Sequence, residues 1–188
     1  MKYLRLLLTV VLTPTSLLAN DYFSEIRYEN RAGRSGQSDS GIYGVALGGY
    51  IDNIFEIDFF SRKKYPRSGS DNLRLELGGK YKYKYSLNTS VSLFTRVATG
   101  KEYRPNDNYS YWNIENGIKS RINSHLDGIF SLRFRDSYNQ NKWRAFDRTY
   151  RAGLIYKASE TVSINLNYNH ARGEIQFDGV GLNIKVNF

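Results

Sequence analysis

The sequence predicts an all-β protein, a transmembrane antiparallel up-and-down β-barrel of about ten strands. The first observation is alternation: the segment LRLELGGKYKYKY, Leu73 to Tyr85, has apolar or aromatic residues at odd positions except Gly79 and charge or glycine at even ones. Such a strand has one apolar and one charged face. The second observation is length, because most predicted strands run nine to fifteen residues, enough to cross a bilayer at a tilt.

The first nineteen residues read as a secretory signal peptide. Lys2 and Arg5 supply the positive start, an apolar stretch follows, and Ala19 precedes the polar Asn20. We expect cleavage after Ala19, which leaves residues 20–188 as the barrel domain. The chain has no cysteine, so disulfides and a lipid anchor on an N-terminal cysteine are excluded. No later stretch is apolar for about 18 residues, as a membrane-spanning helix requires.

The composition is basic, and this points to an anionic partner. The formal charge is +9, and +7 remains without the signal residues Lys2 and Arg5. Acidic solutes and lipopolysaccharide are the expected partners, together with membrane lipid. Nucleic acid is not expected for an exported chain. The mean hydropathy of −0.55 is compatible with a barrel, because only alternate residues of each strand face lipid.

Ten strands are expected from the period of two, joined by connections that tend to alternate between short and longer. Short turns at one end and longer loops at the other are typical of outer-membrane barrels. The expected strands are Tyr22–Asn30, Gly41–Ile51, Ile54–Arg62, Asp71–Tyr85, Thr89–Thr99, Tyr109–Ile122, Leu126–Asp136, Arg144–Tyr156, Val162–His170 and Ile175–Phe188.

The apolar rows of these strands are expected to face lipid. Three of these residues, Leu75, Leu132 and Ile164, distinguish a membrane barrel from a soluble sandwich. In a soluble sandwich they would pack together in a dry centre. The 16 tyrosines gather near strand ends, where amphipathic rings suit the two membrane interfaces. Arg144 and Arg148 share the lipid parity and are expected among headgroups or at a bulge.

The last strand ends in VGLNIKVNF, with alternate apolar residues and a terminal Phe188. Here the chain resembles bacterial outer-membrane β-barrel proteins. The resemblance implies residence in the outer membrane of a Gram-negative bacterium. It also implies that Phe188 is an assembly signal, read by the barrel-assembly machinery.

The charged faces are expected to line the lumen, where fixed cations raise the local anion concentration. One prediction is a narrow porin-like channel for passive diffusion of small anionic solutes. The alternative is a closed, non-conducting barrel with a structural or surface-binding role through its extracellular loops, because small barrels are filled by side chains. Basic residues outnumber acidic ones on the inward faces of the strands, and this excess favours the channel. The predicted pore-lining basic residues are Arg27, Arg74, Lys80, Lys82, Lys84, Arg96, Lys119, Arg121, Arg133, Arg135 and Arg151.

A second resemblance points the same way. The first strand carries Glu25, Arg27 and Glu29 in alternation, similar to the first strand of small monomeric porins specific for acidic oligosaccharides. This resemblance implies a lumen lined with basic residues. It does not extend to the substrate class, because those porins are longer chains with more strands.

An enzyme is not predicted. Outer-membrane lipid A deacylases place His and Ser two residues apart on one barrel face, but Arg172 follows His170 here. His170 with Asp147 or Asp178 would imitate the acid and histidine groups of outer-membrane proteases. We expect no catalytic residue, no cofactor and no metal site, because the chain lacks cysteine and its second histidine, His125, belongs to the opposite end.

Two glycine-containing features have structural explanations. The pairs Gly48-Gly49 and Gly78-Gly79 precede no helix and are expected to allow strand bending or close packing. The loop from Arg31 to Gly36 offers two arginines, Arg31 and Arg34, that could hold lipopolysaccharide phosphates or simply face water.

Overall fold

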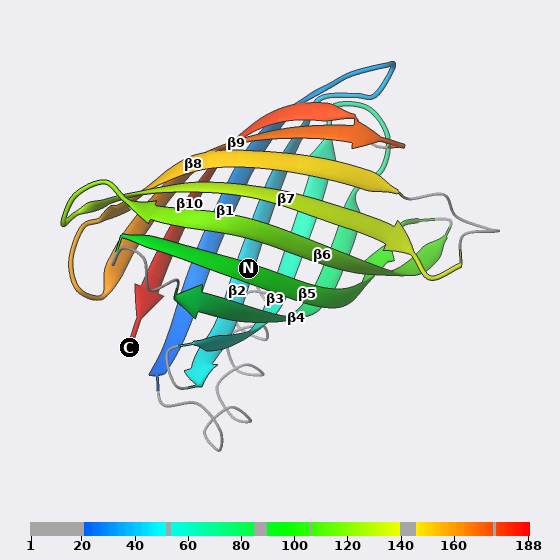
Figure 1. Ribbon diagram of the computed structural model, residues 1–188. Helices are drawn as coiled ribbons and strands as arrows, with labels where there is room; N and C mark the ends of the chain where they lie inside the picture. The colour runs from blue at the N-terminus through cyan, green and yellow to red at the C-terminus, as the bar shows by residue number, and fades with distance from the viewer. Residues whose placement is uncertain (1–20, 52–53, 85–89, 106, 140–145, 175) are drawn as a thin grey trace.

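The computed structural model of the chain is a closed barrel of ten antiparallel strands (Figure 1). It describes residues 21–188 except 52–53, 85–89, 106, 140–145 and 175, and not the side chain of Lys84. Consecutive strands pair throughout, and the first closes against the last. The strands are β1 (Asp21–Gly33), β2 (Ser40–Ile51), β3 (Phe55–Pro66), β4 (Asn72–Lys84), β5 (Val91–Tyr103), β6 (Asn108–Arg121), β7 (Leu126–Ser137), β8 (Asp147–Lys157), β9 (Val162–Gly173) and β10 (Phe177–Asn187).

The all-β class, the antiparallel order and the ten strands are therefore confirmed. The predicted signal peptide, residues 1–19, lies outside the described residues, and its cleavage stays a prediction. In the described part of the chain, no helix is long and apolar enough to cross a membrane.

The main correction concerns strand ends. Strands β1, β3, β5 and β9 continue three or four residues beyond the predicted ends, so the connections 34–39, 67–71, 104–107 and 174–176 are short. Only the connection 138–146 is long. The extensions carry charged residues such as Arg31, Lys64 and Glu102, which resemble loop residues in a sequence. These residues are polar because the strand extensions surround an interior that is itself lined with charged side chains.

The two ends of the barrel are distinguished by the chain termini. The backbone amides of Tyr22 and Phe188 each donate to the carbonyl of the other, at 2.9 Å. We call this end, which carries Asp21 and Phe188, the terminal end. The opposite end, which carries the connections 34–39, 67–71, 104–107, 138–146 and 174–176, is the loop end. An even number of strands brings both described chain ends to one side.

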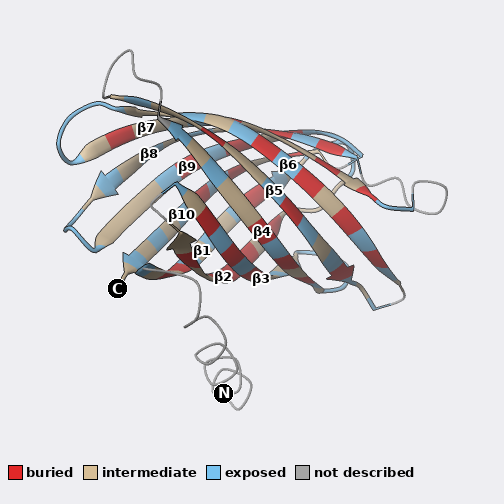
Figure 2. Ribbon diagram, turned by 60° about the horizontal axis from the view of Figure 1, so that its bottom comes forward, coloured by how far each residue is buried: buried red, intermediate tan, exposed pale blue. Residues whose placement is uncertain are grey.

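Apolar side chains face outward, as the alternation predicts. Ile26 is 65% exposed and Leu166 is 53% exposed, and along most strands buried residues alternate with less buried ones (Figure 2). Leu75, Leu132 and Ile164 lie on this same outward face, each partly exposed. The buried positions are largely polar or charged, including Arg135, Asp127 and Glu76. An apolar exterior around a charged interior suits hydrocarbon outside and water inside.

Outward tyrosines gather toward both ends of the barrel. Near the loop end, the rings of Tyr28 and Tyr43 lie 5.0 Å apart and Tyr65 meets Tyr43 edge-on at 5.8 Å. Near the terminal end, Tyr81 and Tyr83 pack edge-on at 4.4 Å. All five rings are more than a third exposed. This arrangement matches aromatic girdles at the two interfaces of a bilayer.

The lipid-facing assignment predicts a depth-dependent cost for an outward charge. Leu166→Arg, near mid-strand, should lower the free energy of unfolding in phospholipid vesicles by about 2–4 kcal/mol, because no water solvates a guanidinium there. Val91→Arg, at an outward strand end, should cost far less. Urea titrations followed by tryptophan fluorescence measure both. Equal effects of the two substitutions would contradict a lipid-facing wall.

Candidate functional site

The barrel encloses a cavity of about 410 Å³, lined by the inward faces of the strands. It begins at the terminal end beside Ser159 and Asn187 and runs to Arg62, Arg74 and Arg133 toward the loop end. Among the described residues, twelve that line it are Lys or Arg and seven are Asp or Glu. Three further carboxylates, Asp127, Glu102 and Asp147, pair with lining cations without lining the cavity themselves. The cavity is therefore electropositive. Its lining cations are Arg27, Arg31, Arg62, Arg74, Lys80, Lys82, Arg96, Lys119, Arg133, Arg151, Lys157 and Lys185.

The excess charge is concentrated at the terminal end, where five lysines share two carboxylates. The ammonium groups of Lys80, Lys82 and Lys185 lie 3.9, 3.7 and 3.4 Å from the same Oε2 of Glu56. Farther around the wall, Lys119 and Lys157 lie 2.9 and 3.0 Å from Oδ2 of Asp127. We call these five lysines the lysine group. In the ion pairs of the described residues, these five ammonium groups therefore outnumber their carboxylate partners.

Aromatic faces support several of these cations. The Lys185 ammonium lies 3.4 Å from the centre of the Phe23 ring, and Lys82 lies 4.5 Å from the Tyr50 ring. Deeper in the lumen, the Arg27 guanidinium lies over the ring of Phe60 at 4.4 Å. Cation–π contacts stabilise a cation without cancelling its charge, so the lumen keeps its positive potential.

In the middle of the lumen, cations and carboxylates are paired more evenly. Arg96 bridges Asp58 at 2.6 Å and Glu76 at 2.7 Å, and Arg151 pairs with Glu115 at 3.1 Å. Gly78 allows the first bridge, because a Cβ on Gly78 would lie 2.3 Å from the Arg96 guanidinium. The predicted close packing at this glycine pair is thus confirmed for Gly78, whose neighbour is a charged group in the lumen.

Near the loop end, inward side chains of nine strands are almost fully buried, each at most 7% exposed. We call them the loop-end group. The cavity reaches three of its members, Arg31, Ile42 and Arg74, and goes no farther. The closely packed side chains of this group therefore narrow the cavity at this level. The group comprises Arg31, Ile42, Arg74, Glu102, Tyr109, Arg135, Asp147, Ala171 and Phe177.

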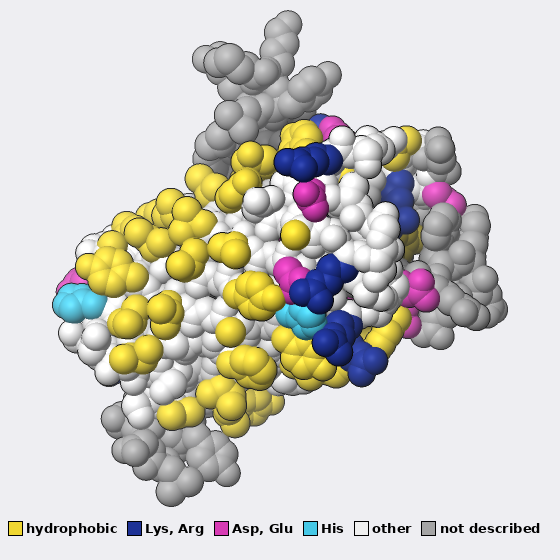
Figure 3. Space-filling view, turned by 90° about the horizontal axis from the view of Figure 1, so that it is seen from above, with side chains coloured by type: hydrophobic (Ala, Val, Ile, Leu, Met, Phe, Trp, Pro, Cys, Tyr) yellow, Lys and Arg dark blue, Asp and Glu magenta, His cyan; other side chains and the backbone are white. Residues whose placement is uncertain are grey.

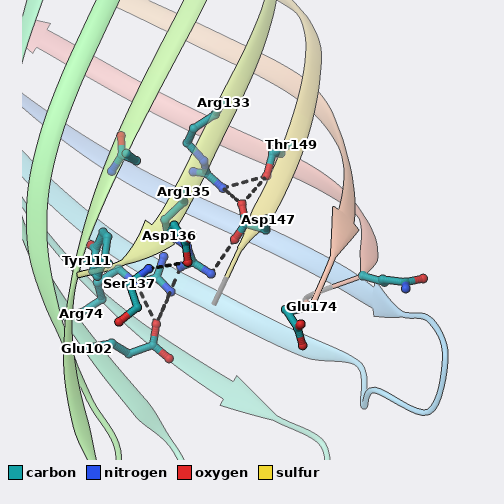
Figure 4. Close-up of polar contacts among 12 residues, drawn as sticks. Arg74, Glu102, Tyr111, Arg133, Arg135, Asp136, Ser137, Asp147, Thr149 and Glu174 are labelled. Carbon is teal, nitrogen blue, oxygen red and sulfur yellow. Dashed lines mark hydrogen bonds and ion pairs between the residues drawn. The ribbon is translucent and has the colours of Figure 1, made fainter. Parts of the chain in front are cut away.

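Ion pairs hold one side of the loop-end group together (Figure 4). Arg74 pairs with Glu102, which also accepts a hydrogen bond of 3.0 Å from the Tyr109 hydroxyl. Arg135 pairs with Asp147 at 2.5 Å and lies 3.8 Å from Glu102. These charges are removed from water, so each depends on its partner.

Two interior residues, Tyr111 and Arg62, stand between the loop-end group and the middle of the lumen. Tyr111, which does not line the cavity and is fully buried, donates to Glu76 at 2.8 Å and carries Arg74 over its ring at 4.9 Å. Arg62 lines the cavity directly opposite Arg74 on the neighbouring strand. No described carboxylate forms an ion pair with Arg62, although two arginines opposite each other repel. Arg62 therefore faces the cavity without an ion-pair partner among the described residues.

The structure distributes the eleven predicted pore-lining residues unevenly. Eight line the cavity: Arg27, Arg74, Lys80, Lys82, Arg96, Lys119, Arg133 and Arg151. Arg135 is buried in the loop-end group instead. Arg121 has the inward parity but lies exposed at the end of β6, and the side chain of Lys84 lies outside the described residues. Whether these residues line a conducting path stays a prediction.

Sequence reasoning missed several interior charges. Arg62 has the same parity as Glu56 and Asp58 on its strand, so the period of two could have found it. Arg31 and Glu102 lie in strand extensions that were predicted as loops. Arg31 points into the barrel and pairs with Glu29 at 2.8 Å, so it faces neither an outer phosphate nor bulk water, the two alternatives expected for it. No sequence signal separates such residues from solvated loop residues.

The histidines lie apart from the lumen charges. His170 faces outward, and its Nδ1 lies 2.7 Å from Asp178, whereas Asp147 is inside the barrel with Arg135. His125 lies in the connection at the terminal end, near the ring of Tyr156. Among the described residues, no group of three or more His, Cys, Asp or Glu side chains is arranged to hold a metal ion.

Comparison with solved structures identifies the class of this fold. An outer membrane channel from Pseudomonas putida F1 aligns with a TM-score of 0.62 at 7% identity, covering 94% of this chain and 100% of that one. The β domain of the Bordetella autotransporter Brka gives 0.58 at 11% identity, covering 90% and 100%. The NanC porin gives 0.50 at 9% identity, covering 87% and 98%. The chain therefore has the fold of bacterial outer-membrane β-barrel proteins, as its last strand predicted.

The similarity is confined to structure. No protein-family model matches the sequence, and no curated protein sequence matches it. At identities of 7–11%, shared architecture carries no residue roles, so function has to be argued from the lumen.

The desolvated pairing of the loop-end group makes a stability prediction. Asp147→Asn leaves the buried Arg135 without its nearest counter-charge and should lower the free energy of unfolding by about 3–5 kcal/mol. The matched control is Asp71→Asn, which removes the exposed partner of Lys63 and should leave the urea midpoint unchanged. If both variants shift the midpoint equally, the Arg135 pair is not desolvated.

Proposed function

We propose that the protein is a narrow channel of the bacterial outer membrane through which small anionic solutes diffuse passively. The observation that carries the proposal is the cavity with twelve cationic and seven anionic lining residues. In the proposed orientation, the terminal end faces the periplasm and the loop end faces outward, as in other even-stranded outer-membrane barrels. The proposal includes no enzymatic activity.

The lysine group supplies the selectivity. Three of its five ammonium groups converge on Glu56 alone, so their combined charge exceeds that of the carboxylate. Confined between walls of low dielectric, this excess attracts anions and repels cations. The three ammonium groups lie 3.4–3.9 Å from the Glu56 carboxylate that they share. At these distances each pairing is loose, so an incoming anion can take the place of the carboxylate as their partner.

Arg62 and its neighbours provide the next position for an anion. Its guanidinium lines the cavity without an ion-pair partner among the described residues, and Arg74 and Arg133 lie along the same part of the wall. A guanidinium binds carboxylates and phosphates through two parallel hydrogen bonds. The charges thus lead an anion from the lysine group to the loop-end group, where passage requires side chains to exchange partners.

The packing of the loop-end group favours a second candidate function. With Glu102, Tyr109, Arg135 and Asp147 at most 4% exposed, the same barrel would be closed if these side chains never separate. Its role would then be structural, or surface binding through the outer loops. Conductance distinguishes the two functions, because only a channel passes current.

The channel predicts steady current in planar bilayers, with chloride more permeant than potassium in the reversal potential. Lys82→Gln combined with Lys185→Gln removes two charges of the lysine group and should lower the chloride-to-potassium permeability ratio roughly twofold. The control is Lys101→Gln, an outward lysine on β5 beside Tyr103, which should leave the ratio unchanged. A silent wild-type protein would support the closed barrel, and an unaltered ratio in the double variant would remove the lysine group from the conducting path.

A second prediction concerns the narrow level. Tyr111→Ala removes a fully buried ring that contacts Arg74 and Arg135, so it should raise the single-channel conductance severalfold and preserve anion preference. Phenylalanine keeps the ring and loses only the hydroxyl bond to Glu76, so Tyr111→Phe should conduct nearly as the wild type does. If alanine leaves conductance unchanged, the Tyr111 ring does not limit flow.

A further inference from the structure

An unexplained group of cations lies on the outer wall at the loop end, outside the lumen. Arg148 on β8, Arg172 on β9 and Arg34 just after β1 form it, and we call it the outer arginine cluster. Figure 3 shows Lys and Arg side chains gathered beside a histidine at one end of this face, next to hydrophobic side chains. The proposed channel makes no use of these residues.

Arg148 and Arg172 are direct neighbours across β8 and β9, and both are exposed. Like charges opposite each other destabilise a strand pair. Arg148 contacts the Phe146 ring at 5.7 Å, and no described carboxylate forms an ion pair with Arg148 or Arg172. A bound anion would remove this repulsion.

The neighbouring polar groups hold Arg172 in place without neutralising the cluster. Arg172 donates through Nε to Nε2 of His170 at 2.9 Å, and Nδ1 of His170 lies 2.7 Å from Asp178. Asp178 also accepts from the Tyr168 hydroxyl at 2.5 Å and pairs with Arg34. The one carboxylate is thus shared among three partners. Among the described residues, none accepts a hydrogen bond from the Nη atoms of Arg172, which leaves these donors for another acceptor.

The position of the cluster identifies the kind of acceptor. Directly beneath it, strands β8, β9 and β10 present an apolar outward face, so the cluster is the first polar level above hydrocarbon. That level of a bilayer holds headgroup phosphates, which arginine binds bidentately. The apolar side chains beneath it are Tyr150, Leu154, Leu166, Tyr168, Val180 and Leu182, each 38–54% exposed.

We propose that the outer arginine cluster binds a phosphate group of lipid A, the phosphorylated glycolipid of the bacterial outer leaflet. Arg148 and Arg172 donate hydrogen bonds to the phosphate oxygens, and His170 and Asp178 position Arg172. The acyl chains lie against the apolar face of β8, β9 and β10. The proposal depends on the loop end facing outward and does not depend on conduction through the lumen.

The test is native mass spectrometry of the folded protein in detergent, titrated with bisphosphorylated lipid A. Arg148→Gln combined with Arg172→Gln should weaken the apparent affinity at least about tenfold, since two charge-assisted contacts are lost. The matched control is Lys63→Gln with Lys101→Gln, two exposed outward lysines at the loop end of β3 and β5, which should bind as the wild type does. Heat-modified gel mobility verifies that each variant is folded.

Two further arms separate phosphate recognition from other causes. Dephosphorylated lipid A should bind the wild type and the double arginine variant equally, and millimolar inorganic phosphate should fail to displace bisphosphorylated lipid A. If the arginine and lysine variants lost affinity for bisphosphorylated lipid A equally, net charge alone would explain the loss. That result would overturn the proposed site. Displacement by inorganic phosphate would also overturn it, by leaving a site for free phosphate.

Discussion

The constraint on which this structure depends is the cost of holding charge inside a narrow barrel. Ten strands with apolar outer faces must direct their other residues into a lumen too small to hydrate each charge fully. Every buried carboxylate or guanidinium therefore needs a partner. The pairs of Arg96 with Asp58 and Glu76, and of Arg135 with Asp147, satisfy this requirement in successive parts of the lumen.

The requirement relaxes toward the terminal end, where the cavity meets water. There the lysine group exceeds its carboxylates, and aromatic rings such as Phe23 support the cations without neutralising them. The lumen consequently changes along its length, from paired guanidinium and carboxylate groups near the loops to ammonium groups that share carboxylates near the termini. The proposed anion pathway depends on this gradient, which a uniform plug of salt bridges would lack.

Much of the fold could be predicted from the sequence, because lipid and water impose opposite requirements on alternate residues. Strand β4 has leucine and tyrosine outside and Arg74 and Glu76 inside. Both the strand and its two faces could be predicted from the alternation in its sequence. The ends of strands were not readable, because Arg31 and Glu102 are polar whether they face a lumen or bulk water. Nor could the sequence reveal that Arg135 is buried while Arg121, of the same inward parity, is exposed. That difference arises from how side chains of distant strands meet.

The central claim, a lumen whose uncompensated cations hold mobile anions, is tested most directly by anomalous diffraction from crystals soaked in bromide. The account predicts bromide peaks inside the barrel, beside Lys80, Lys82 and Lys185 and at the Arg62 guanidinium. Rubidium soaked at the same concentration should leave the lumen empty. Rubidium in the lumen, or bromide confined to the outer surface, would contradict the account.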